Sequence, residues 1–352
     1  MTLVAREGGA AVPGQRPLVS VIVPNYNYSR TLRLCLAALQ QQTYSPLEIL
    51  VVDDRSTDDS LTVARSFDVT VLQPETNGGV SRARNLGASH ATGEILFFLD
   101  SDVALAPDAV ASAVAVLDAD PAIGAVCGNY DPEPLIRDSL IEEYRNFHQH
   151  FWIGALEGQL HGFVPTAILA VRARVFAEVG PFNPKLRDTE SAEYGNRLSE
   201  RYDVRLSNAI RGRHDNDDTL RLVLRKVFTR SRTQFALFVK DREVSRAVAS
   251  SPARAALAAA LAVAAVPAPL LLGPAAAVLP AGLLAVALRC DAPLYRAARR
   301  YRGRAFAVFC MGMHTLVNLT IAAGCAAGLL QWWSSAAYRT LHDPVPPPTE
   351  AA

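Results

Sequence analysis

Two carboxylates close a strongly apolar run in the first half of the chain, where Asp100 and Asp102 flank Ser101 directly after ILFFL. A hard divalent cation such as Mg²⁺ or Mn²⁺ is held by one or two carboxylates together with the phosphate oxygens of a substrate. The pair therefore predicts a metal and phosphate site. Taken alone, a D-x-D pattern is more typical of a strand-terminating turn with a helix cap, so the assignment depends on the motifs that precede it.

A second acidic pair ends the apolar run LEILVVD. Asp53 and Asp54 are followed by Ser56–Asp59, a turn whose side chains can also cap the next helix. Two adjacent carboxylates at a strand end are well placed to hydrogen-bond the base and ribose of a nucleotide, and we assign Asp54 to that ligand. Simple capping stays open as the alternative for residues 56–59.

The third motif, NGGVSRARNLGA, places Gly78 and Gly79 before a helix that carries Arg82, Arg84 and Asn85. Flexible glycine backbone, a helix N-terminus and two guanidinium groups suit a diphosphate, so Arg84 is a candidate ligand-binding residue. The alternative is a glycine-rich turn that leads into an amphipathic helix.

Alternating apolar runs and helical stretches must position these motifs. The expected strands are 18–23, 47–53, 69–72 and 94–100, and the expected helices lie near 31–41, 60–67, 81–90 and 108–118. Runs rich in Val, Ile, Leu and Phe without strict alternation fit strands buried on both faces of a parallel sheet. The pattern predicts a doubly wound α/β domain, whose ligands lie at the carboxyl ends of the strands.

Composition narrows the class of protein. The chain has 352 residues, with 35 Lys and Arg against 34 Asp and Glu and a net charge of +1, which argues against nucleic acid as a partner. Half of the residues are hydrophobic and the mean hydropathy is +0.13, slightly too apolar for an ordinary soluble enzyme. The five cysteines are widely spread, so neither a disulfide framework nor a zinc site is expected.

Three membrane helices are expected between residues 251 and 335. No charged residue occurs between Arg254 and Arg289, and four prolines interrupt that stretch, which favours two helices joined by a tight turn. The run 305–333 predicts a third helix that ends in two tryptophans. The alternative is a buried Ala/Leu-rich helical subdomain of a soluble protein.

Arginines set the expected orientation. They crowd the connection 289–304, whereas the turn near 269–274 has none, so the connection and the preceding domain are expected on the cytoplasmic side of a cell inner or plasma membrane. The N-terminus has no secretion signal, and the C-terminus should lie across the membrane. Basic residues interleaved with apolar ones after position 219 predict an amphipathic helix that contacts anionic membrane lipids.

The expected organisation is a flexible tail at 1–16, a catalytic domain at 17–250, the multi-pass membrane region at 251–335 and a flexible tail at 336–352.

Five motifs in order resemble the inverting, nucleotide-sugar-dependent glycosyltransferases of family 2, which have the GT-A fold. The motifs are VSVIVPNYN, DDRSTD, NGGVSRARNLGA, FLDSDV and AVRARVFAEVGPFNPKLRDTESAEYGNRL, within residues 17–214. The resemblance implies that Pro24, Tyr26 and Asp54 contact the nucleotide, supported by Asp53. It also implies that Asp100 and Asp102 form the site for the diphosphate and for Mg²⁺ or Mn²⁺, approached by a late histidine that corresponds to His214. An exposed loop histidine is the alternative for the last position.

In the family, an acidic pair before an E-[FYL]-x-x-R run supplies the base that deprotonates the acceptor. Alignment on the run 193–197 puts Glu190 and Ser191 on that pair, so the second carboxylate is missing. A serine hydroxyl cannot accept a proton at neutral pH, which makes Glu190 the first candidate base, followed by Asp188 and Glu193. In the alternative, Glu190 and Glu193 form a solvated helix face that pairs with the arginine of the run.

The resemblance implies hexosyl or related glycosyl transfer from a nucleotide-sugar donor. The membrane helices expected beside the catalytic domain suggest a lipid-linked or cell-envelope glycan acceptor, for example in the synthesis of an envelope polysaccharide. Two other functions stay open. A nucleotidyltransferase would normally show a glycine-rich loop with a lysine near the first strand, and VPNYNYSRT has neither. A catalytically degenerate, membrane-anchored nucleotide-sugar-binding protein is made plausible by Ser191.

Overall fold

The chain forms two compact units. The computed structural model describes residues 16–161, 164–186, 189–240 and 251–340. Among these, the first unit contains 16–137 and 152–216, and the second contains 138–151 and 217–340. The sequence predicts one boundary at residue 250, whereas the helix after residue 217 groups with the C-terminal helices. Packing explains the difference, because Tyr144 and Val223 share an apolar cluster with Phe306.

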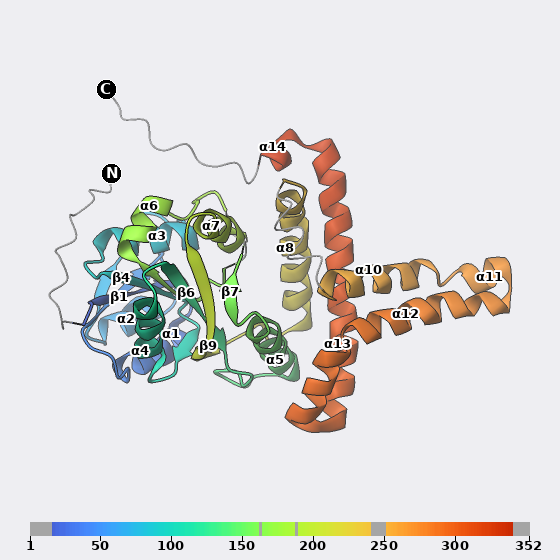
Figure 1. Ribbon diagram of the computed structural model, residues 1–352, viewed down its shortest axis with the longest axis horizontal. Helices are drawn as coiled ribbons and strands as arrows, with labels where there is room; N and C mark the ends of the chain where they lie inside the picture. Colours follow the sequence, from blue (N-terminus) through green and yellow to red (C-terminus); the bar gives the residue numbers. More distant parts are fainter. Residues whose placement is uncertain (1–15, 162–163, 187–188, 241–250, 341–352) are drawn as a thin grey trace. The chain divides into compact units, whose positions relative to one another are not determined.

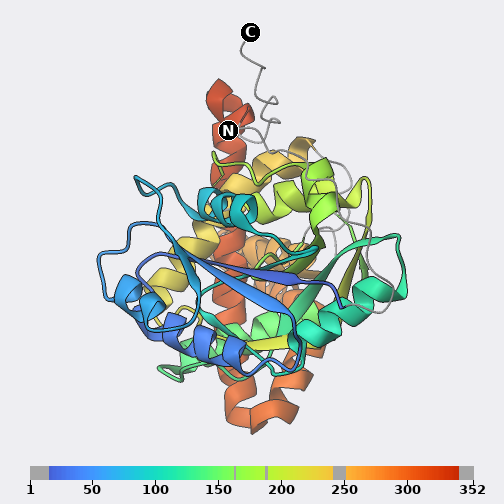
Figure 2. The same cartoon turned by 90° about the vertical axis from the view of Figure 1, so that its left-hand side faces the viewer.

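A nine-stranded sheet with the order β3-β2-β1-β4-β8-β6-β9-β5 forms the first unit, and β7 pairs with β9 (Figures 1 and 2). The strands are β1 (Val19–Asn25), β2 (Leu47–Asp53), β3 (Thr70–Leu72), β4 (Ile95–Leu99), β5 (Val103–Leu105), β6 (Ile123–Tyr130), β7 (Gly158–Leu160), β8 (Ile168–Arg172) and β9 (Asp203–His214). The helices are α1 (Ser29–Gln40), α2 (Ser60–Arg65), α3 (Val80–His90), α4 (Ala109–Ala119), α6 (Ala173–Val179) and α7 (Glu190–Ser199). The predicted strands and helices up to residue 119 are confirmed.

The sheet is mixed rather than wholly parallel. Strands β1, β2, β3 and β4 run parallel as expected, but β8 is antiparallel to both β4 and β6. Because Leu99 pairs with Ile168, the chain re-enters the sheet at the carboxyl end of β4 and has to run back along it. The same register lets the amide of Asp100 donate to the carbonyl of Ala167 at 3.1 Å. Residues just before β8 therefore lie beside the D-x-D turn.

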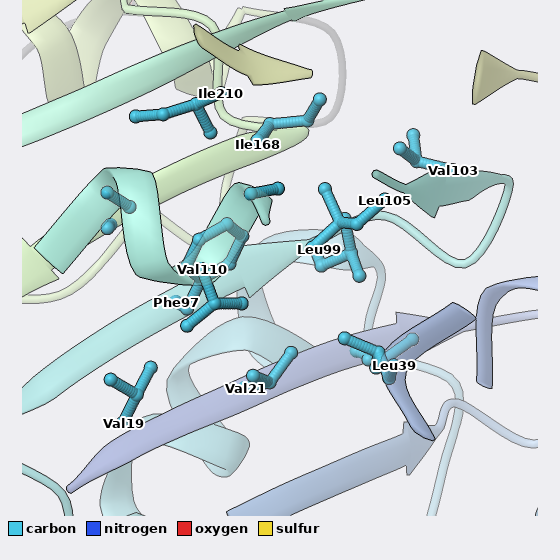
Figure 3. Packing of buried hydrophobic residues seen from close by; sticks show 14 of the residues in the cluster. Val19, Val21, Leu39, Phe97, Leu99, Val103, Leu105, Val110, Ile168 and Ile210 are labelled. Carbon is cyan, nitrogen blue, oxygen red and sulfur yellow. The ribbon is translucent and has the colours of Figure 1, made fainter. Parts of the chain in front are cut away.

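Both faces of the sheet are buried, as the apolar runs predict. Val21 of β1 packs with Leu39 of α1 and Val110 of α4 on one face (Figure 3). Ile22 of the same strand lies in a second cluster with residues of α6 and α7. Helix α3 approaches β1 closely because Gly87 has no side chain; a Cβ atom there would lie 2.4 Å from Cγ2 of Ile22. This close packing fixes the height of α3 above the sheet.

Helices alone form the second unit (Figure 1). They are the first part of α5 (Leu140–Gly154), α8 (Leu220–Lys240), α10 (Ser251–Ala264), α11 (Ala268–Leu272), the short 3₁₀ helix η1 (Pro274–Ala277), α12 (Val278–Cys290), α13 (Ala292–Ser334) and α14 (Ala336–Arg339). Helices α10 and α12 lie side by side, so the predicted helical hairpin is present. Most of the two expected flexible tails lies outside the described residues, but residues 336–339 form a helix.

The arginine-rich connection predicted at 289–304 is a helix, not a loop. Pro293 occupies the first turn of α13, where a proline is tolerated, and Ala, Leu and Arg all favour helix. The helix is interrupted at Arg302 and Gly303, whose φ angles are −137° and 82°. Glycine accepts the second of these without strain.

One helix of the described residues meets the length and hydropathy expected of a membrane span. Helix α13 has 43 residues, with a mean hydropathy of 1.6 over its most apolar window. The apolar stretches Arg254–Ala264 and Pro274–Cys290 are each shorter than 18 residues. The sequence predicts three spans, of which this criterion supports one by length and composition.

Candidate active site

The loops after β1 and β2 are joined to each other at the carboxyl edge of the sheet. The side-chain oxygen of Asn27, whose φ is 59°, accepts hydrogen bonds from the amides of Thr57 (2.7 Å) and Asp58 (3.3 Å). The backbone amide of Asn27 donates to the hydroxyl of Ser56 at 3.0 Å. Pro24 is buried in β1, whereas the ring of Tyr26 is 46 % exposed. An exposed aromatic ring beside a rigid loop pair suits the base of a nucleotide.

Asp53 makes hydrogen bonds to three neighbouring segments of the protein. Its side chain is fully buried, and it accepts hydrogen bonds from Nδ2 of Asn25 (3.3 Å) and Nε2 of Gln73 (3.1 Å). The amide of Ser56 also donates to it, at 3.2 Å. The carboxylate therefore ties β1, β2 and the segment after β3 together.

Asp54 organises the glycine loop. Its carboxylate accepts from the amides of Gly78 (2.8 Å) and Gly79 (2.7 Å), and the residue is only 3 % exposed. Gly79 has a φ of 83°, a conformation that favours glycine. In this conformation both carboxylate oxygens already accept backbone hydrogen bonds, so Asp54 shapes the wall of the site as well as being its expected nucleotide contact.

Arg84 joins two carboxylates that are far apart in the sequence. Its Nη2 atom donates to Oδ1 of Asp100 at 2.7 Å, and its Nη1 atom donates to Oε1 of Glu190 at 3.3 Å. The guanidinium is 2 % exposed and lies over the ring of Phe182. Burial alone would lower the pKa of Arg84, but Asp100 and Glu190 raise it above its ordinary value. In this structure, the guanidinium that is expected to contact a diphosphate makes ion pairs with two protein carboxylates.

Asp102 and His214 meet where β5 pairs with the end of β9. Nε2 of His214 lies 3.5 Å from Oδ2 of Asp102, and the His214 ring stacks on Tyr130 with 4.7 Å between centroids. The amide of Asp215 donates to the carbonyl of Asp102 at 2.9 Å. Burial would lower the pKa of His214, but the charges of Asp102 and Asp100 raise it. The expected approach of His214 to the D-x-D turn is present.

A divalent cation fits this end of the sheet only as part of a complex with its substrate. In the described residues no group of three or more His, Cys, Asp and Glu side chains is arranged as a metal site. However, Oδ1 of Asp102 is buried and has no hydrogen-bond partner. An unpaired buried carboxylate oxygen is costly in isolation and suits a cation whose remaining ligands are phosphate oxygens.

The predicted base segment lies in the first turn of α7. Glu190 is 8 % exposed and bonded to Arg84, whereas Glu193 is held by Arg197 through contacts of 2.6 and 3.1 Å. The arginine pairing of the alternative thus applies to Glu193, but Glu193 is also only 8 % exposed, so neither glutamate lies on a solvated face. Asp188 lies outside the described residues.

Thr166 is a site residue that the sequence reasoning missed. The hydroxyl of Ser191 lies 2.7 Å from that of Thr166 and 3.5 Å from Oε1 of Glu190. No motif marks Thr166, because its place depends on the antiparallel return of the chain into β8. A hydroxyl pair therefore occupies the position at which a second carboxylate was expected.

The mixed sheet, with acidic pairs at the carboxyl ends of β2 and β4, has a fold of the GT-A type. Residues 20–179 match the family model described as glycosyl transferase family 2. The chain therefore contains a family 2 glycosyltransferase domain.

Similar proteins support this assignment. The chain is 36 % identical over 110 residues to an uncharacterized glycosyltransferase of Haemophilus influenzae, covering 31 % of this chain and 37 % of that protein. It is 29 % identical over 179 residues to a PGL/p-HBAD biosynthesis glycosyltransferase of Mycobacterium tuberculosis, covering 49 % and 65 %. The chain thus spans less than two thirds of the length of these curated relatives. A mannosyltransferase of Pyrobaculum calidifontis, solved with GDP-Man and Mn²⁺, shares the fold, with a TM-score of 0.59, 22 % identity and coverage of 90 % and 88 %.

Removal of the Arg84 charge should destabilise the first unit. In Arg84→Met, Asp100 and Glu190 lose their shared cation, and breaking such a buried pair costs about 3 kcal/mol of unfolding free energy. The melting temperature of the detergent-solubilised chain should fall by about 5 °C or more. The control is Arg82→Met, since Arg82 is exposed on the same helix and forms no ion pair within the described part of the chain. Equal melting temperatures for the two variants would contradict the bridging role.

Loss of the Asp102 carboxylate should remove activity. Asp102→Asn should lower the release of nucleoside diphosphate from nucleotide-sugar donors by about a hundredfold or more, because a ligand for the cation and diphosphate is lost. Asp68→Asn, an exposed carboxylate just before β3, should leave activity unchanged. If Asp102→Asn retains activity within about twofold of the parent, the assignment of this carboxylate is wrong.

Proposed function

We propose that this chain is an inverting glycosyltransferase that moves a hexosyl or related group from a nucleotide-sugar donor to a lipid-linked or cell-envelope glycan acceptor. The observation that carries the proposal is the bridge from Asp100 through Arg84 to Glu190. It brings the carboxylates expected for donor and acceptor chemistry to one end of the sheet. The family assignment of residues 20–179 supports the same reaction class.

The donor is assigned to the carboxyl ends of β1, β2 and β4. Tyr26 and the loops held by Asp53 and Asp54 line the place for the base and ribose, and Asp100 and Asp102 lie where a diphosphate would complete a cation site. Mg²⁺ or Mn²⁺ would be held by Asp102 with Asp100 and His214 nearby. The Pyrobaculum mannosyltransferase was solved with GDP-Man and Mn²⁺, which supports a donor and cation of this kind.

The reaction follows from this arrangement as an in-line displacement at the anomeric carbon. The acceptor hydroxyl attacks, the bond from the anomeric carbon to the phosphate oxygen breaks, and the nucleoside diphosphate leaves with the bonding electrons. Glu190 accepts the proton of the hydroxyl. A divalent cation, when bound, offsets the negative charge that develops on the diphosphate. One displacement inverts the configuration and requires no covalent enzyme intermediate.

Glu190 is favoured over the other described carboxylate as base. Glu193 is held by two contacts to Arg197, so both of its oxygens are engaged. Glu190 makes its bond to Arg84 through Oε1, and it lies at the start of α7 beside the turn that carries Asp100. We assign Oε2 of Glu190 as the atom that takes the proton from the attacking hydroxyl.

Replacement of the base should slow the chemical step. Glu190→Gln should lower the rate of glycosyl transfer by about a hundredfold or more, the usual range for loss of a general base. The affinity for the nucleoside diphosphate should change little, since its expected contacts lie on β1, β2 and β4. Transfer under saturating acceptor and diphosphate binding by calorimetry measure the two quantities separately.

Two further variants identify the base among the three candidate carboxylates. Glu193→Gln is the control on the same helix and should transfer at nearly the parent rate. If Asp188→Asn loses transfer while Glu190→Gln retains it, Asp188 is the base. If all three variants retain transfer, the segment is not catalytic.

A second candidate function is that of a catalytically degenerate nucleotide-sugar-binding protein. The pairing of Ser191 with Thr166 favours it, because no carboxylate occupies the second position of the expected acidic pair. Donor binding without release of nucleoside diphosphate, tested over a panel of nucleotide sugars with native lipid extract, would support this candidate. Release with any donor would exclude it.

The proposed place of action is the cytoplasmic face of a cell inner or plasma membrane. Helix α13 meets the length and hydropathy of a span, and apolar residues of the hairpin are exposed. Arginines between 289 and 304 are also exposed, as expected next to anionic lipid headgroups. Three crossings, as the sequence predicts, would place the residues after Ser334 across the membrane, whereas a shallower attachment would keep them on the cytoplasmic side.

A further inference from the structure

The hairpin of α10, α11, η1 and α12 presents an apolar surface on nearly all sides. At its tip, Leu270 is 89 % exposed, Leu271 and Leu272 are 78 % exposed, and Val278 is 75 % exposed. No charged residue occurs from position 255 to position 288. Apolar surface of this extent is normally covered by a partner or a bilayer. A segment without any charge on either leg fits hydrocarbon better than it fits a folded protein partner with a polar rim.

The base of the hairpin is anchored and basic. Ala258 and Ala259 of α10 pack with Ala287 of α12 and with Leu319 of α13, so the legs are held together at the end opposite the exposed leucines. Arg254 and Arg289, which bound the uncharged stretch, are both exposed. The charge pattern of the hairpin therefore matches a hydrocarbon interior at the tip and anionic headgroups at the base.

Helix α13 is packed against a charged helix over the part that would have to cross the bilayer. A Cβ atom at Gly324 would lie 2.7 Å from the carbonyl oxygen of Phe228, and one at Gly328 would lie 2.7 Å from that of Arg232. The hydroxyl of Tyr338 donates to the same carbonyl of Arg232. Helix α8 thus lies in close contact with α13 as far as the end of its apolar run.

The charges of α8 decide what this contact implies. Arg221, Arg225 and Arg230 are exposed on α8. If α13 crossed the bilayer in this packing, these guanidinium groups would enter the hydrocarbon without partners, which is strongly unfavourable. At the headgroup level, the same side chains would face lipid phosphates while the apolar face of α8 stays on α13.

We propose that the chain is held in the membrane by the hairpin 254–290 alone, with an anionic bilayer as its partner, while α8 and α13 lie at the headgroup level. This proposal rests on the proposed function only where it assigns the first unit to the cytoplasmic side of the membrane. At about 1.5 Å per residue the two legs, 254–272 and 274–290, are about 28 and 25 Å long, close to the thickness of the hydrocarbon core. The chain enters and leaves on one side, so the residues before the hairpin and those after Ser334 share the cytoplasmic face.

The sidedness of the C-terminal residues tests the proposal directly. A reporter fused after Thr340 of the full chain should report the same side as one fused before Pro17, in cells with a single bounding membrane or in the inner membrane of cells with two. In a variant without the five native cysteines, Gly273→Cys should react with a lipid-soluble maleimide but not with a membrane-impermeant one from the cytoplasmic side. Opposite sides for the two reporters would overturn the proposal in favour of three crossings.

Matched arginine substitutions separate the hairpin from α13. Val263→Arg combined with Leu270→Arg, at hairpin positions 55 % and 89 % exposed, should lower the ratio of membrane-bound to soluble chain by about a hundredfold. Val308→Arg combined with Leu330→Arg, at α13 positions 68 % and 64 % exposed, should leave that ratio within about threefold of the parent. The reverse result would show that α13, not the hairpin, is the membrane element.

Both double variants should bind nucleoside diphosphate in detergent as the parent does, which confirms that they are folded. Release of nucleoside diphosphate is then measured on the same samples. Transfer without the expected sidedness would overturn the hairpin proposal and leave the enzymatic proposal standing. The expected sidedness without transfer from any donor would support the hairpin proposal and overturn the enzymatic proposal.

Discussion

The first unit depends on one buried guanidinium. Arg84 supplies the only cation in direct contact with Asp100 and Glu190 among the described residues, and these carboxylates come from the turn after β4 and from α7. Without that charge, two acids would face each other at a poorly solvated end of the sheet. The distance between the donor and acceptor ends of the proposed site is therefore set by the span of one planar side chain. A lysine could not reproduce it, because its compact ammonium lacks the planar fork whose two separate nitrogens reach the two carboxylates.

The position of Arg84 is in turn fixed by the backbone around it. Gly87 lets α3 pack against Ile22, and Asp54 holds the amides of Gly78 and Gly79 that lead into the same helix. The glycine motif thus positions the Arg84 bridge as well as leaving room for the proposed ligand. This explains how a buried Arg84 and an expected phosphate-binding loop can belong to one short segment.

A structural feature could be predicted from the sequence when the residues that form it are close together in the sequence, and not when they are far apart. The bounds of β1, β2 and α3 could be predicted because apolar runs and the residues that end them are local signals. The acidic ends of β2 and β4 were correctly placed at one edge, since parallel strands share their carboxyl ends. The pairing of Leu99 with Ile168 could not be predicted, because an antiparallel return after a long excursion leaves no local pattern. Thr166 carries no signal in the sequence for that reason, and the bonds of Arg84 to Asp100 and Glu190 could not be predicted because these partners lie 16 and 106 residues away in the sequence.

The second unit shows how a polar network can orient an apolar element. Asp291, at the junction of α12 and α13, is fully buried; Nε2 of His314 lies 3.0 Å from its carboxylate and Nδ2 of Asn318 donates to it at 3.1 Å. The hydroxyl of Tyr144 from α5 lies 3.1 Å from Nδ1 of His314. The chain passes from α12 to α13 at Asp291, but contacts among alanines and leucines are not directional and would not by themselves fix how the end of α12 lies against the part of α13 that carries His314 and Asn318. Directed bonds to Asp291 hold the end of α12 at a fixed position on α13. The direction in which the hairpin leaves α13 is therefore set by this polar network rather than by the lipid that the hairpin would enter.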